Sequence, residues 1–125
     1  MTTEQYNSMV AMLITATQNK KLIWKSSDED FCTNIGGCSI WLCSNYDFSV
    51  NVSTYNLKLF NKDNVQFENF SYSDDVNADE YRQLDQLYKS IRDVLYKITE
   101  SENIILKGLN DLMTPDFSET DDLPF

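Results

Sequence analysis

Two adjacent glycines, Gly36 and Gly37, constrain the fold of this chain more than any other feature. They lie between two segments of alternating residues, 31–35 and 38–43. Both central positions of a two-residue hairpin turn need positive φ, which glycine adopts without strain, so the pattern predicts a tight β-hairpin. Such a turn fixes the register of its strands. The predicted cross-strand pairs are Ile35 with Cys38, Asn34 with Ser39, Thr33 with Ile40, Cys32 with Trp41, and Phe31 with Leu42.

Segments on both sides of the hairpin extend it into a sheet. Alternation predicts further strands at 21–25, 50–60 and 65–72, separated from the hairpin by loops at 26–30 and 45–49. Within 50–60 the apolar positions change from even to odd numbers, which predicts a β-bulge or a break near Ser53 and Thr54.

Helical segments flank this sheet. Thr2 and Gln5 have the spacing of a capping box, at the start of a helix that should end near Gln18. Asn77 is a candidate cap for a second helix. After it, apolar residues recur every three or four positions over about ten turns. They are Tyr81, Leu84, Tyr88, Ile91, Leu95, Ile98, Ile105, Leu109 and Leu112.

This series is longer than a small sheet can cover. Thr99–Glu102 has the composition of a new helix cap, so we expect a break there. The second piece either folds back or pairs with another chain, and packing on the sheet is favoured over a coiled-coil seam. We also expect a homo-oligomer.

These elements predict an α+β fold. It has a twisted antiparallel meander of four to five strands, an N-terminal helix and a long C-terminal helical region. An OB-type barrel is the alternative, although the helix usual between its third and fourth strands is missing. Residues 1–113 should form one domain, and residues 114–125 a disordered acidic tail.

The composition argues against an enzyme. The chain has no histidine, so histidine-based acid–base or triad chemistry is excluded. Cys32, Cys38 and Cys43 lack metal-site spacing, so we expect neither a metal nor a cofactor. No apolar run is long enough for a membrane span and no secretory signal is visible, so we expect no membrane partner and a location in the cytoplasm of a bacterial host cell.

One face of the predicted sheet combines lysines with aromatic residues. Lys21, Lys25 and Lys58 should lie on it with Trp41 and Phe60. Lysines neutralise phosphates and aromatic rings stack on any base, so this pattern is typical of a sequence-tolerant single-strand binder. The net charge of −10 counts against a nucleic-acid binder unless charge is segregated between faces. The alternative is a second helix-covered face with ordinary lysines at its edge.

The chain ends in Asp121-Asp122-Leu123-Pro124-Phe125. Proline stiffens this ending, so the phenyl ring and the terminal carboxylate can enter an apolar pocket beside a basic residue together. The ending resembles the acidic tip of bacterial single-stranded-DNA-binding proteins. That resemblance implies that the tip binds replication, repair and recombination proteins and does not itself hold DNA.

The resemblance covers about the last eight residues. For the body, the order of a meander followed by a long helix is similar, in topology alone, to the coactivator/Whirly type of single-strand binder. Together these features lead to the hypothesis of a sequence-nonspecific single-stranded-DNA-binding protein of a phage or other mobile element. Its tip would recruit host or phage replication and recombination proteins.

Two other hypotheses remain open. The chain could be a protein-interaction module without DNA affinity, such as a nucleic-acid mimic or an inhibitor of the anti-defence type. It would use the tail to dock on host proteins, and its acidic body favours this reading. Alternatively, it could be a structural oligomeriser built on the long helix.

Overall fold

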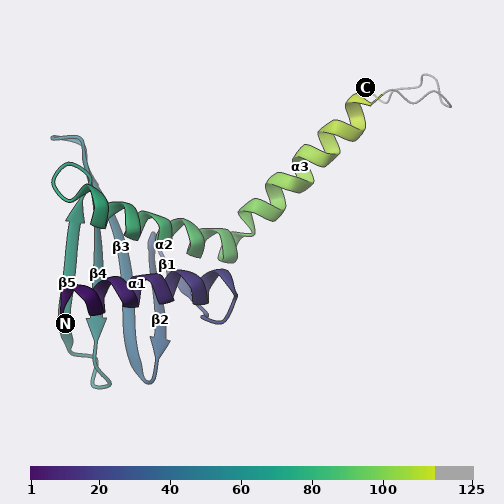
Figure 1. Ribbon diagram of the computed structural model, residues 1–125. Helices are drawn as coiled ribbons and strands as arrows, with labels where there is room; N and C mark the ends of the chain where they lie inside the picture. Colours follow the sequence, from purple (N-terminus) through teal and green to yellow (C-terminus); the bar gives the residue numbers. More distant parts are fainter. Residues whose placement is uncertain (115–125) are drawn as a thin grey trace.

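The computed structural model describes residues 1–114 and has the expected α+β architecture (Figure 1). Over these residues, five antiparallel strands form a meander with the spatial order β1-β2-β3-β4-β5. The sheet does not close within the described part of the chain, so the OB-type barrel is not the fold. The elements are α1 Thr3–Gln18, β1 Lys25–Ser27, β2 Asp30–Ile35, β3 Cys38–Asp47, β4 Val52–Phe60, β5 Gln66–Ser73, α2 Ala78–Tyr96 and α3 Ile98–Met113.

The predicted hairpin is confirmed, including its register. Gly36 and Gly37 form the turn with φ of 61° and 86°, and all five predicted cross-strand pairs are present. β3 continues beyond the predicted end, because it pairs with β4 as far as Asp47 opposite Val52. The expected loop at 45–49 is therefore wrong for its first three residues.

The strand expected at 21–25 is wrong except for Lys25, because the C-terminal cap of α1 uses the backbone at the start of this segment. The capping box of Thr2 and Gln5 at the other end of α1 is confirmed. At its C-terminus, Lys20 adopts a left-handed conformation with φ of 59°. Its N–H donates to Thr17 O (3.0 Å), and the Lys21 N–H donates to Ala16 O (2.8 Å), which is a Schellman motif. Pairing starts only at Lys25, so β1 and the start of β2 occupy much of the expected loop at 26–30.

The bulge expected near Ser53 and Thr54 is also wrong. β4 pairs regularly with β3 through this region, and Val50 simply precedes the strand. The irregularity in the sheet lies between Leu59 and Phe60 in the pairing of β4 with β5. A change of parity in the sequence can thus mark the start of a strand rather than a bulge within it.

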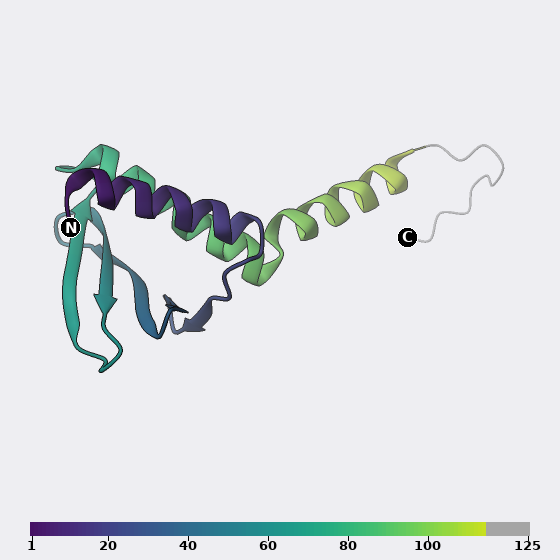
Figure 2. The same ribbon diagram turned by 60° about the horizontal axis from the view of Figure 1, so that its bottom comes forward.

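The core lies between one face of the sheet and the helices α1 and α2. Figure 2 shows both helices on the same side of the sheet. The centre of this core is formed by Phe31, Leu42, Leu57, Leu84, Leu87 and Ile91, each at most 1% exposed. Trp24 is buried beside α1, where its indole N–H donates to Thr17 Oγ1 (2.9 Å). The expectation that helices cover the apolar face of the sheet is confirmed.

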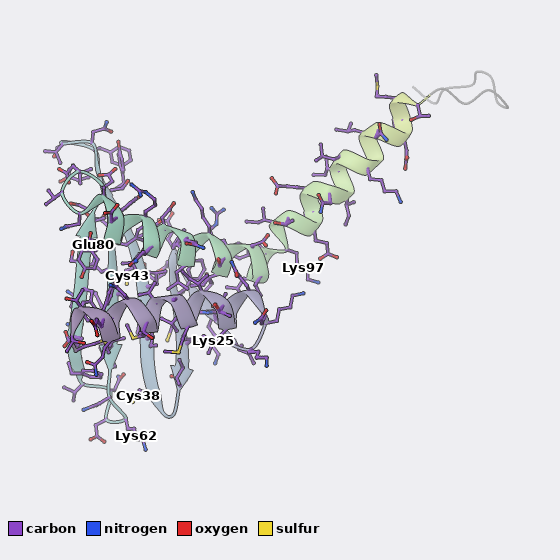
Figure 3. The ribbon with its side chains drawn as sticks, viewed as in Figure 1. Lys25, Cys38, Cys43, Lys62, Glu80 and Lys97 are labelled. Carbon is purple, nitrogen blue, oxygen red and sulfur yellow. The ribbon has the colours of Figure 1, made fainter. Side chains whose placement is uncertain are left out.

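The predicted break in the C-terminal helical region is confirmed, slightly earlier than expected. Lys97, with φ of 52°, separates α2 from α3, and Figure 3 labels it at this junction. The Asp93 carboxylate accepts a hydrogen bond from the Thr99 N–H (2.6 Å) across the break. α2 packs on the body, but α3 leaves it (Figure 1) and has no buried residue along its described length. The expectation that the whole apolar series packs on the sheet is therefore wrong for α3.

Candidate nucleic-acid interface

The sheet face opposite α1 and α2 is covered by no described element (Figure 2). The register of the strands places one row of side chains across this open face. From β1 to β5 the row contains Lys25, Cys32, Trp41, Lys58 and Asn69. Neighbouring strands lie about 4.8 Å apart, so this row is about 19 Å long. In this row Trp41 lies between Cys32 on β2 and Lys58 on β4, directly beside each.

Phe60 lies on the same face, in the next row. It follows Lys58 by two residues along β4 and pairs with Ser39 and Gln66. Trp41 and Phe60 are therefore diagonal neighbours, about 7–8 Å apart at their backbones, within reach of aromatic side chains. Both rings are half-buried by their neighbours on the sheet. The face thus offers two aromatic groups side by side.

Lys21 is not part of this face, contrary to the prediction. Its backbone N–H belongs to the cap of α1, and its side chain is exposed. It lines a shallow groove beside α1 with Met12 and Thr15. Four of the five predicted residues therefore lie on the open sheet face, and Lys21 lies in the helical layer.

The polar residues of β5 complete the face and were not predicted as part of it. Asn69 closes the row that contains Trp41, and Ser71 pairs with Asn56 one row away. The signal is present in the sequence, because these polar residues alternate with Phe70 and Tyr72 along the strand. That alternation assigns them to the face opposite the core.

The thiols of the open face are protonated near neutral pH. Burial raises the pKa of Cys32, although the Lys25 ammonium acts in the opposite direction. The pKa of Cys43 is also raised by burial, and the Asp30 carboxylate adds to this effect. A protonated thiol is neither a nucleophile nor a metal ligand. Within residues 1–114, no group of three or more His, Cys, Asp or Glu side chains is placed to hold a metal ion.

Charge is distributed unevenly between the two layers. Among the described residues, the three helices contain eight acidic and four basic side chains. On the open face, by register, Lys25 and Lys58 are balanced by Asp30 and Asp47. The negative charge of the body is therefore concentrated away from this face, which itself is formally neutral.

The tail residues Asp121, Asp122, Leu123, Pro124 and Phe125 lie outside the described part of the chain. None of the helices within residues 1–114 is long and apolar enough to cross a membrane. In comparisons with known proteins, no family model matches the chain, and no curated protein or solved structure shows a significant match.

Proposed function

We propose that the protein binds single-stranded DNA without sequence preference on its open sheet face. The observation that carries this proposal is the placement of Trp41 beside Lys58, with Phe60 as its diagonal neighbour, on a face that no described helix covers. Every base has a π-face, so stacking on these rings tolerates any sequence. Lys25 and Lys58 would contact phosphates on either side of Trp41.

The tail supplies the second part of the proposed function. Its ending resembles the tip that recruits partners to single-strand binders, so we assign it to replication or recombination proteins of a phage, a mobile element or their host. α3 supports this division of labour, because its sixteen residues rise about 24 Å and lead from the body to Met113.

Tryptophan fluorescence tests the proposed DNA face. Single-stranded oligonucleotide should quench Trp41, whereas Trp24 is buried and hydrogen-bonded in the core and should respond little. Trp41→Ala should weaken binding by about 1–3 kcal/mol, the range for one lost stack, or about 5- to 150-fold in Kd. Trp41→Phe keeps a ring and should retain most of the affinity. Equal affinity of wild type and Trp41→Ala would exclude Trp41 as a stacking platform.

The tail is tested by moving only its carboxylate. Adding one residue after Phe125 keeps every acid, Leu123, Pro124 and the ring. Loss of binding to replication or recombination proteins, with unchanged DNA affinity, is expected if the carboxylate is recognised. Deletion of Asp121–Phe125 is the positive control for loss. Full partner binding by the extended protein would exclude carboxylate recognition.

A second candidate is a protein-interaction module without DNA affinity, and the tip of the β3–β4 connection favours it. Phe48 is 87% exposed there and packs edge-on against Tyr46, with ring centroids 4.7 Å apart. Asp47 lies between these rings in the sequence. An exposed aromatic pair beside an acid suits a basic protein surface better than a phosphate backbone. A gel-shift assay with a single-stranded oligonucleotide separates this candidate from the first.

A further inference from the structure

α3 is a helix without tertiary support. It extends from the body in both views, and none of its sixteen described residues is buried. Isolated helices of about this length are marginal in water, because their stability normally comes from packing an apolar face. Its exposed apolar side chains, each between 53% and 80% accessible, are Ile104, Ile105, Leu106, Leu109, Leu112 and Met113.

Most of these residues lie on one side of the helix. Ile105, Leu109 and Leu112 are separated by four and three residues, which aligns them along one face. Leu106 and Met113 widen that face, and we call these five residues the α3 stripe. Ile98 lies on the same side of the helix but is half-buried beside α2. The opposite side is polar, with Glu100, Asn103, Lys107 and Asn110. Ile104 is outside the stripe. Successive helical residues are about 100° apart, so Leu106 turns from Ile105 towards Leu109 and Met113, whereas Ile104 turns the opposite way.

The charge of α3 argues against a lipid surface as its partner. Helices that lie on membranes carry lysine and arginine on their polar side, where they meet anionic headgroups. α3 has three acidic residues and one basic residue: Glu100, Glu102, Asp111 and Lys107. An anionic bilayer would therefore repel the polar side of this helix.

We propose that the α3 stripe is the contact between two copies of this chain, paired antiparallel around a twofold axis that passes through the stripe at the level of residue 107. In this arrangement Ile105 of each copy packs against Leu109 of the other. Gly108 lies beside the axis. A Cβ at this position would have no neighbour within 4 Å in the single chain, so the surface there is open to a second helix.

Electrostatics decides between the two orientations. Parallel pairing would place Glu102 against the same residue of the second copy within the stripe, and would bring the two acidic bodies together. Antiparallel pairing places Glu102 near Leu112 of the other copy, at the end of the contact. It also separates the two Lys97 residues by about 30 Å along the axis, beyond the screening length of about 10 Å at 0.1 M salt.

The size of the stripe predicts a reversible dimer. At about 80–100 Å² per Ile, Leu or Met side chain, the ten side chains of two stripes bury about 800–1,000 Å², at the lower limit for a specific interface. Association should therefore depend on protein concentration. This inference does not rest on DNA binding, so failure of either proposal leaves the other intact.

Sedimentation equilibrium of the full chain tests the contact. The weight-average mass of the wild type should rise from 14.5 kDa towards twice that value. The rise should occur between about 1 µM and 1 mM, the range for small interfaces. Ile105→Glu should remain monomeric, with its Kd raised more than about tenfold. Ile104→Glu is the matched control, since it makes the same change at the neighbouring residue outside the stripe, and it should dimerise as the wild type does. A wild type that stays monomeric, or equal loss in both variants, overturns the proposal.

Mixing wild type with Glu102→Arg tests the orientation by native mass spectrometry. Antiparallel pairing keeps the two 102 positions about 15 Å apart along the axis, so mixed dimers should form in statistical proportion. In a parallel pair the opposite charges would meet, and an excess of mixed dimers would overturn the antiparallel arrangement.

Discussion

The salt dependence of DNA binding measures how many lysines the open face supplies. Lys25 and Lys58 lie on that face, whereas Lys21 lies beside α1. Two phosphate contacts on a single strand predict a slope of log Kobs against log salt near −1.4, at about 0.7 per contact. Three contacts, as the sequence alone predicts, would give about −2. The slope thus distinguishes the two-lysine face of the structure from the three-lysine face predicted from the sequence.

Substitutions assign this slope to residues. Lys58→Gln should flatten it to about −0.7, because one phosphate contact is lost while much of the side-chain packing beside Trp41 is kept. Lys21→Gln removes the same charge from the helical layer and should leave the slope unchanged. Fluorescence anisotropy of a labelled oligonucleotide can follow binding between about 0.01 and 0.3 M salt, where the screening length falls from about 30 Å to below 10 Å. A slope near zero, or equal flattening by both variants, would refute binding on the open sheet face.

Three further predictions concern stability. Thr17→Val should destabilise the fold by about 1–3 kcal/mol in urea unfolding, because the buried Trp24 indole N–H loses its acceptor, while Thr17→Ser should retain most of the stability. Lys20→Gly should raise stability by about 0.5–1 kcal/mol, since glycine adopts positive φ without strain, and Lys21→Gly should give no such gain. Burial raises the pKa of Tyr55, so the folded state keeps a proton that the unfolded state loses above about pH 10. The contribution of Tyr55 to stability should therefore be constant up to about pH 10 and be lost above it, so the fall above pH 10 should be less steep in Tyr55→Phe.

The parts of the fold that were predictable are those set by local chemistry. Gly36 and Gly37 specify a two-residue turn, and that turn determines every pair of the hairpin. Thr2 and Gln5 specify the start of α1 through reciprocal hydrogen bonds of 3.1 and 2.9 Å. In both cases the decisive interactions lie within a few residues of one another in the sequence.

The errors arise where two local patterns compete. Residues 21–25 alternate like a strand, but the backbone N–H groups of Lys20 and Lys21 are used by the cap of α1. The left-handed position of this cap is usually glycine, but here it is Lys20, so the sequence gives no signal for the cap. The same error placed Lys21 on the candidate DNA face. Trp41 was assigned to that face by the hairpin register, and Lys58 and Phe60 by the alternation along β4.

The direction of α3 could not be predicted, because periodicity does not specify what covers an apolar stripe. The series from Tyr81 to Leu112 looks continuous, yet the left-handed Lys97 divides it into a buried and an exposed part. Only the first part has a partner within the described chain. The spacing of the second part is equally compatible with a fold-back and with a second copy.

The exposed helix also determines how the two proposed binding surfaces relate. Thr114 follows Ile98 by sixteen residues, or about 24 Å of helix, which exceeds twice the screening length of about 10 Å at 0.1 M salt. In a single chain, the acids after Thr114 therefore begin beyond the range at which their field alone weakens phosphate binding by Lys25 and Lys58. Only a tail that returns to the sheet could compete with DNA. If both proposals hold, a partner that holds Phe125 would prevent that return, and the recruited protein and the bound strand would be able to occupy one molecule together.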